Sequence, residues 1–254
     1  MSPMVNRFAS AGGEVTQQTL DYYQARARGG VAMIVVEAVG VDGNHLWIEP
    51  QLRIDKDCYI SGLRRLVEAI HVCGIPVCIQ LHHAGMWGTD PVAPSDVPCI
   101  ELGVRYEQPR TLSQEEIKRI VDLFAQAALR AKAVGFDAIE LHGGTSYLLQ
   151  QFVSPHTNKR TDGYGGSFEK RIRLPLEIIQ KIRSLCGSDF TIGYRMVADE
   201  LLPDGITQEE SQAFALEPEK ATLAYLSIQL GTYETFCIGE GQMAMRSGLG
   251  NTSL

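Results

Sequence analysis

The chain has 254 residues, of which 44% are apolar, and a formal net charge of −7. This length and composition allow one sizeable core, so we expect a single domain over residues 1–254. The acidic balance argues against nucleic acid or an anionic membrane as the main partner, no run approaches the roughly 18 apolar residues of a membrane span, and the N-terminus shows no signal-peptide pattern.

Predicted strands and helices alternate along the chain. Uninterrupted apolar runs, rich in β-branched residues, predict buried strands at residues 31–37, 75–81, 136–142, 190–197 and 224–230. Between them, helical spacing of apolar residues predicts helices at 58–73, 113–134, 167–186 and 207–216. Strands that alternate with helices are expected to lie parallel, joined by right-handed crossovers.

Local residue choices support the predicted helix ends. Ser113 with Glu116, and Thr207 with Glu210, have the spacing of capping boxes at two helix starts. Gly135 follows a helix where a left-handed C-cap residue is expected, and Gly74 does the same for another.

The arrangement of polar residues favours a (β/α)8 TIM barrel, an α/β fold, over an open doubly wound sheet. The first strand–helix turn has no G-x-G-x-x-G, and polar residues fall at the ends of several strands. Five strands are clear and residues 1–4 could end a sixth, so we expect an incomplete barrel, a fragment lacking the start of the first strand and the last two βα units. We expect the loop at residues 86–112 to cover the active face.

The segment at residues 135–175 indicates catalysis. A predicted strand ends on His142, a polar run with Tyr147 follows, and a Gly-rich loop then leads into a helix. Parallel barrels place their chemistry at the carboxyl ends of the strands, where these residues are expected to lie.

Five motifs carry a resemblance to a known family. They are SPM at residues 2–4, YYQARARGGVAMIVVEAVGV at 22–41, IQLHHAG at 79–85, the segment at 142–166 and GYRMVADE at 193–200. In order and spacing they resemble the Old Yellow Enzyme family of FMN-dependent ene-reductases, including the branch with bacterial 2,4-dienoyl-CoA reductases. The resemblance implies a barrel that binds FMN, takes hydride from NADH or NADPH and passes it to an activated C=C bond.

The resemblance also implies a set of flavin contacts. Gln80 ends an apolar strand, where a buried amide must be paired and suits the pyrimidine edge of a flavin. Arg195 would stabilise the reduced ring from inside the barrel. The alternatives are a Gln80 bonded to nearby backbone, and an Arg195 ion pair with Glu37, Glu140 or Asp199. The full cofactor-binding set that we expect is Ser2, Pro3, Met4, Val5, Ala38, Gln80 and Arg195.

By the same resemblance, His142, Thr145 and Tyr147 form the catalytic site. In the family, a histidine and a second residue three positions on bond the substrate carbonyl, and the tyrosine protonates the α-carbon. His142 and Tyr147 match that pattern, but Thr145 stands for the usual histidine or asparagine, and Ser146 for the usual glycine. A threonine hydroxyl donates one hydrogen bond from a shorter side chain, so carbonyl activation here departs from the family.

We expect no metal site. His82 and His83 are consecutive strand residues that point to opposite faces, so they cannot share one ion. His82 is expected to shape the substrate pocket beside the flavin. The six cysteines lack a C-x-x-C pair, which is typical of a reducing, cytoplasmic setting.

The sequence leaves other functions open. A flavin-dependent amine dehydrogenase of the same fold is one alternative, and a truncated, non-catalytic remnant is another. Phosphate in such barrels is held after the seventh and eighth strands, so we expect this chain alone to bind FMN weakly. The expected ligand is a small-molecule alkene; nucleic acid and membranes are not expected, and a homo-oligomer is left open.

Overall fold

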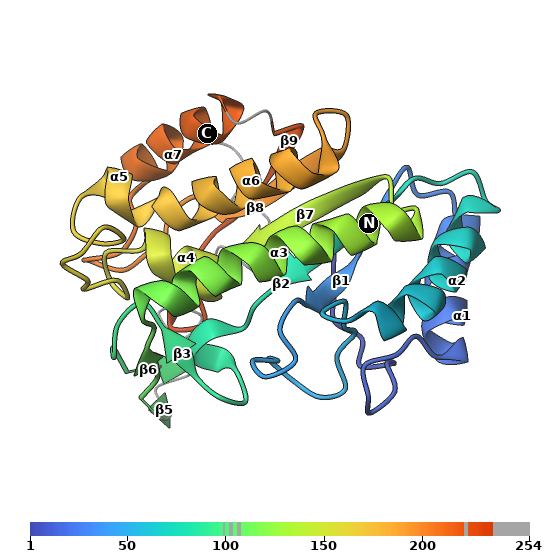
Figure 1. Cartoon of the computed structure of the whole chain (residues 1–254), viewed down its shortest axis with the longest axis horizontal. Coiled ribbons are helices and arrows are strands. Elements are labelled where there is room, and N and C mark those ends of the chain that lie inside the picture. The colour runs from blue at the N-terminus through green and yellow to red at the C-terminus, as the bar shows by residue number, and fades with distance from the viewer. Residues whose placement is uncertain (99, 102–103, 106–107, 221–222, 236–254) are drawn as a thin grey trace.

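The computed structural model describes residues 1–98, 100–101, 104–105, 108–220 and 223–235 (Figure 1). Its centre is a five-stranded sheet with the order β1-β2-β7-β8-β9. The strands are β1 (Ile34–Gly40), β2 (Val77–His82), β7 (Ala138–Gly143), β8 (Thr191–Val197) and β9 (Tyr225–Gln229), and every neighbouring pair is parallel. The spatial order follows the chain without reversal, which is typical of a barrel wall rather than of a doubly wound sheet.

Helices connect these strands and lie along one face of the sheet (Figure 1). The helices are α1 (Gln17–Arg28), α2 (Ile60–His71), α3 (Gln114–Val134), α4 (Leu148–Val153), α5 (Phe168–Arg171), α6 (Arg173–Cys186) and α7 (Gln208–Lys220). Neighbouring helices pack side by side, α1 on α2, α2 on α3 and α3 on α6. In the part of the chain that the structure describes, no helix combines the length and apolar character that a bilayer crossing requires.

The predicted helix ends are confirmed at α3. The Ser113 hydroxyl accepts from the Glu116 backbone N–H at 3.2 Å, and the Glu116 carboxylate accepts from the Ser113 N–H at 2.8 Å. Gly135 closes this helix at φ 108°, a left-handed conformation that glycine adopts without steric cost. At α7 only half of the predicted capping box forms, because the Glu210 carboxylate contacts Arg171 instead.

Other boundaries differ from the sequence prediction. The helix expected at 167–186 is two helices, α5 and α6, separated at Ile172. Helix α1 was not predicted, because it buries only a narrow stripe that includes Leu20, Tyr23 and Ala27. Residues 1–4 form no strand, although the Met1 carbonyl accepts from Val35 N–H at 3.0 Å beside β1.

The two faces of the sheet carry different residues. One face packs against the helices through apolar side chains such as Ile79, Ile139 and Ile192. The opposite, concave face begins with small apolar residues, among them Cys78 and Ala138. Polar side chains follow them toward the carboxyl ends of the strands, because side chains along a strand alternate between its faces.

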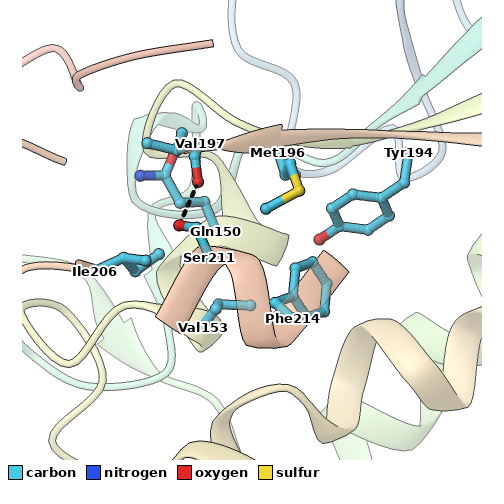
Figure 2. Close-up of a pocket in the computed structure, with 9 residues that line it drawn as sticks. Gln150, Val153, Tyr194, Met196, Val197, Ile206, Ser211 and Phe214 are labelled. Carbon is cyan, nitrogen blue, oxygen red and sulfur yellow. Dashed lines mark hydrogen bonds between the residues drawn. The ribbon is translucent and has the colours of Figure 1, made fainter. Parts of the chain in front are cut away.

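Behind β8, a small cavity holds an unpaired hydroxyl (Figure 2). The Tyr194 ring packs edge-on against Phe214, with centroids 5.3 Å apart. Its hydroxyl is buried and has no hydrogen-bond partner among the described residues. Nearby, the Ser211 hydroxyl donates to the Val197 carbonyl at 3.0 Å, so the Ser211 hydroxyl does not pair with the Tyr194 hydroxyl.

We therefore expect Tyr194→Phe to leave the free energy of unfolding unchanged or to raise it by up to about 1 kcal/mol, because no hydrogen bond is lost. Urea unfolding measures this directly. Tyr23→Phe is the matched control: the Tyr23 hydroxyl accepts from the buried Glu37 N–H at 2.9 Å, so its loss should cost about 1–3 kcal/mol. Equal destabilisation by both substitutions would contradict the assignment.

Candidate active site

A buried carboxylate gathers the two predicted ring-binding residues on the concave face. Glu140 Oε1 accepts from Gln80 Nε2 at 2.7 Å and from Arg195 Nε at 3.3 Å. Glu140 Oε2 accepts from the Tyr225 hydroxyl at 3.2 Å. The Arg195–Glu140 contact is thus the ion pair that the sequence left open as the alternative to a flavin contact of Arg195. Gln80 on β2 and Arg195 on β8 lie on the same face of the sheet, and both contact Glu140 on β7 between them.

Two residues further along the same strands lies a group of rings. His82 ends β2, His142 lies near the end of β7, and Tyr147 precedes α4. The Tyr147 ring centroid is 4.3 Å from that of His82 and 4.8 Å from that of His142. The two imidazole centroids are 5.5 Å apart. The structure therefore brings His142 and Tyr147 together at the strand ends and adds His82 to them.

Both histidines of this group are neutral. Burial lowers the pKa of His82 to about 3. Burial, followed by the charges of His82 and Arg195, lowers the pKa of His142 well below its usual value. The Gln51 amide N–H lies 3.1 Å from His82 Nδ1, which must accept, so the His82 proton is on Nε2. His82 Nε2 and His142 Nδ1 are buried and have no partner among the described residues.

Thr145 occupies a constrained turn between β7 and α4. Thr145 and Ser146 have φ values of 55° and 60°, which non-glycine residues seldom adopt. Side chains hold the turn: Gln150 Oε1 accepts from Ser146 N–H at 2.6 Å, and Trp87 Nε1 donates to the Ser146 carbonyl at 3.1 Å. The Thr145 hydroxyl accepts from Gln229 Nε2 at 2.7 Å and donates to Gln229 Oε1 at 3.1 Å, so this hydroxyl is already engaged.

Aromatic residues that the sequence did not single out complete the site. The Tyr147 and Tyr233 hydroxyls share a hydrogen bond of 2.6 Å. Trp47 lies 5.8 Å from the Tyr147 ring, and Trp87 lies 4.9 Å from the Tyr233 ring. Trp47 and Trp87 are the two tryptophans of the chain, and Trp47 lies in a loop whereas Trp87 ends the short 3-10 helix Gly85–Trp87. Trp87 also belongs to the predicted covering loop, at its start.

The N-terminal segment lies beside β1, where the Met1 carbonyl accepts from the Val35 N–H. Pro3 is buried, whereas Ser2 and Met4 are exposed and Val5 is partly buried. The Ala38 carbonyl accepts from Gln51 Nε2 at 2.9 Å, so this backbone group is occupied.

Just beyond that segment, Glu37 binds the Asn6 backbone N–H at 2.6 Å. Burial raises the pKa of this carboxyl group to about 7, against the lowering effect of the Asn6 hydrogen bond. Glu37 is therefore partly protonated near neutral pH, because it is buried between β1 and the N-terminal segment.

The polar side chains of this face are chemically compatible with the ring of FMN. Gln80 and Arg195 place an amide and a guanidinium on one face of the sheet, and these are groups that can hydrogen-bond the polar edge of a flavin ring. The unpartnered nitrogens of His82 and His142 are buried groups that a bound ligand would satisfy.

One group of potential metal ligands occurs in the described part of the chain, formed by Asp42, His45 and His83. The Arg119 guanidinium lies 3.3 Å from the Asp42 carboxylate and competes with a cation. Gly85 N–H donates to His83 Nδ1 at 3.1 Å, which places the His83 proton on Nε2 and removes the lone pair there. His82 faces the concave side while His83 stacks on His45, with centroids 5.1 Å apart. We retain the expectation of no metal.

The protonated His156 forms ion pairs with two other loops beside the site, through Asp204 and Glu234. His156 lies 3.2 Å from Glu234 and 2.7 Å from Asp204. The Glu234 hydrogen bond, assisted by Asp204 and opposed by burial, raises the pKa of His156 to about 9. Glu234 follows Tyr233, so this ion pair also anchors the segment that carries that tyrosine.

Because the pKa of His156 is raised on folding, its contribution to stability is fully present below pH 6.5 and is lost as pH rises through about 9. The difference in unfolding free energy between the wild type and His156→Gln should therefore be greatest at pH 6 and vanish above about pH 9.5. Urea unfolding across this range checks the prediction. A difference that is constant with pH would contradict it.

Comparison with known proteins gives the relationship. The sequence model of the NADH:flavin oxidoreductase / NADH oxidase family matches residues 1–243. The chain is 46% identical over 245 residues to the NADH oxidase of Thermoanaerobacter brockii, covering 92% of this chain and 37% of that protein. It is 34% identical over 244 residues to the NADH:acrylate oxidoreductase of Vibrio harveyi, covering 92% and 24%. The N,N-dimethylglycine/sarcosine dehydrogenase of Chromohalobacter salexigens is 36% identical over 214 residues, covering 82% and 31%.

Solved structures agree with the sequence matches. The old yellow enzyme homologue from Zymomonas mobilis aligns with a TM-score of 0.81 and 27% identity, covering 91% of this chain and 69% of that one. Morphinone reductase in complex with tetrahydroNAD aligns with a TM-score of 0.78 and 32% identity, covering 90% and 68%. The chain thus spans 24–37% of the length of these sequence relatives and 68–69% of these two structures. The predicted fold class, part of a TIM barrel, and the Old Yellow Enzyme resemblance are confirmed, and the chain belongs to the NADH:flavin oxidoreductase / NADH oxidase family.

Proposed function

We propose that this chain is a single oxidoreductase domain that binds FMN and, with NADH or NADPH as reductant, reduces an activated C=C bond of an enone, an enoate or a dienoyl compound. The observation that supports it most is the two-layer concave site. Gln80 and Arg195 meet on Glu140, and His82, His142 and Tyr147 lie one step further along the same strands.

Each residue has a distinct part in this proposal. Gln80 and Arg195 bind the polar edge of the ring, and Arg195 favours negative charge that develops there. Residues 2–5 and Ala38 border the ring on the β1 side. His142 donates a hydrogen bond to the substrate carbonyl and withdraws electron density from the C=C bond. The Tyr147 hydroxyl then donates a proton to the α-carbon, with Tyr233 as its hydrogen-bond partner.

The second donor to the carbonyl is the open part of this assignment. The Thr145 hydroxyl must leave Gln229 before it can serve. The neutral His82 carries an unpartnered N–H next to His142 and is already free to donate. The chemistry that bound FMN supplies is hydride acceptance from NAD(P)H and hydride donation to carbon.

The test is anaerobic. The protein is saturated with FMN, and NADH or NADPH is then added. The visible absorbance of the oxidised flavin is followed, because it is lost when the flavin is reduced. We expect bleaching by the nicotinamide and recovery on addition of an enone, with formation of the saturated ketone. Failure of either phase would reject the proposal. Acrylate belongs in the substrate panel, because a relative is an NADH:acrylate oxidoreductase.

An amine dehydrogenase is the second candidate, favoured by the aromatic walls of the site. Trp47, Trp87, Tyr147 and Tyr233 lie within 4.9–6.3 Å of one another in successive pairs. Aromatic faces attract ammonium groups, and one relative is an N,N-dimethylglycine/sarcosine dehydrogenase. Bleaching of the flavin by sarcosine or another secondary or tertiary amine, without nicotinamide, would support this candidate over the first.

A further inference from the structure

The carboxylate of Glu140 contacts both Gln80 and Arg195, and the sequence considered it only as one possible ion-pair partner of Arg195. We infer that Glu140 is a positioning residue that fixes the Gln80 amide and the Arg195 guanidinium in the orientation needed to bind the flavin ring. The inference rests on the proposed function, since it specifies how that site recognises the polar edge of the ring.

Glu140 accepts one hydrogen bond from each of its three partners, Gln80, Arg195 and Tyr225. Only 1% of Glu140 is exposed, and its two oxygens receive hydrogen bonds from Gln80, Arg195 and Tyr225. The carboxylate oxygen that receives the Arg195 Nε–H also receives a hydrogen bond from the Gln80 NH₂, so the NH₂ is the Gln80 group that faces Glu140. Gln80 Oε1 is then the atom turned away from Glu140 and available to accept from a ligand N–H.

The same contact orients Arg195. Its Nε donates to Glu140, and the two terminal NH₂ groups take no part in that contact and remain as donors. The site therefore offers one acceptor from Gln80 and several donors from Arg195. The imide edge of a flavin, an N–H flanked by two carbonyl oxygens, has the complementary pattern.

The register of the strands places these side chains next to one another. The register pairs Gln80 with Glu140 across β2 and β7, so both side chains lie on one face. Glu140 pairs with Gly193 on β8. A Cβ at Gly193 would lie 2.1 Å from the Tyr225 ring, so only glycine lets Tyr225 reach over β8 to Glu140.

The experiment uses the ring without its phosphate. Lumiflavin and 3-methyllumiflavin, in which the imide N–H is replaced, are titrated into the full chain, and fluorescence quenching gives each dissociation constant. The wild type should bind lumiflavin at least about tenfold more tightly, since the methyl derivative leaves Gln80 Oε1 unpaired. In Glu140→Gln the new amide can donate to Gln80 Oε1, so the Gln80 amide can reverse, and the preference should fall to about threefold or less.

Glu115→Gln is the matched control, because Glu115 is exposed in the first turn of α3 and far from the ring-binding residues in sequence. It should keep the wild-type preference. Glu140→Asp is the second variant: it keeps the charge but withdraws the carboxylate from Gln80, and it should also lose the preference. Thermal unfolding confirms that each variant is folded.

The outcomes separate the two proposals. A wild type that binds neither ring would reject the proposed function. A wild type without the preference, or a Glu140→Gln variant that keeps it, would overturn the role of Glu140 alone. Loss of cooperative unfolding in both Glu140 variants would assign this residue to the stability of the fold and would likewise overturn the inference.

Discussion

Replacing Tyr147 with phenylalanine should slow alkene reduction by roughly 10²–10⁴-fold while leaving flavin reduction by NAD(P)H unchanged. The Tyr147 hydroxyl is the proposed proton donor. The Tyr147 ring packs against the rings of His82 and His142, so a phenylalanine keeps this packing and removes only the hydroxyl group. Stopped-flow absorbance measures the two half-reactions separately, and the split between them distinguishes proton donation from ring binding.

The tyrosine next to it provides the internal comparison. Tyr233 shares a hydrogen bond with Tyr147, so Tyr233→Phe should reduce the rate of alkene reduction much less than Tyr147→Phe. Tyr194→Phe, on the opposite face of the sheet, controls for the loss of a buried hydroxyl and should not change turnover. If Tyr233→Phe were the slow variant and Tyr147→Phe were active, the proton donor would have to be reassigned to Tyr233.

Replacing His142 with phenylalanine should lower kcat/KM for an enone by about 10²–10³-fold, the usual cost of losing one donor to a developing oxyanion. Because the pKa values of His142 and His82 are lowered by burial, both donate as neutral rings. The rate of alkene reduction should accordingly show no histidine titration between pH 5 and 8, a range around the usual histidine pKa. A step in the pH profile that disappears in His142→Phe would contradict this.

Two further variants identify the second carbonyl donor. Thr145→Val removes a hydroxyl that is engaged by Gln229, and we expect a loss of about tenfold or less. His82→Phe removes an unpartnered N–H beside His142, and we expect the larger loss. The reverse order would show that the turn opens on substrate binding and that Thr145 serves as the family pattern implies.

Several features of the site could be predicted from local sequence. The apolar run before His142 and the polar run after it place this residue at a strand end, because strand length and burial follow from composition. The alternation of side chains along a strand puts Gln80 and His82 on one face and His83 on the other. The capping pair Ser113 and Glu116 fixed the start of α3, because its hydrogen bonds are made within four residues.

Predictions failed where a distant residue decided the outcome. The expected helix at 167–186 breaks at Ile172, and Arg171, just before the break, donates to the carbonyls of Val153 and Gly166. The predicted capping role of Glu210 is lost to the same Arg171, which lies 39 residues away in the chain. A local sequence pattern shows which side chains can form hydrogen bonds, but it does not show which distant residue they bond to in the folded protein.

By itself, the sequence determined the order of the five sheet strands, the family, and which side chains stand at the strand ends. The tertiary structure decided which of these meet: Glu140 joins Gln80 across 60 residues and Arg195 across 55, and Tyr147 meets Tyr233 across 86. The physical reason is that propensity and periodicity act over a few residues, whereas a buried polar group takes whichever partner the sheet register and packing bring within hydrogen-bond distance.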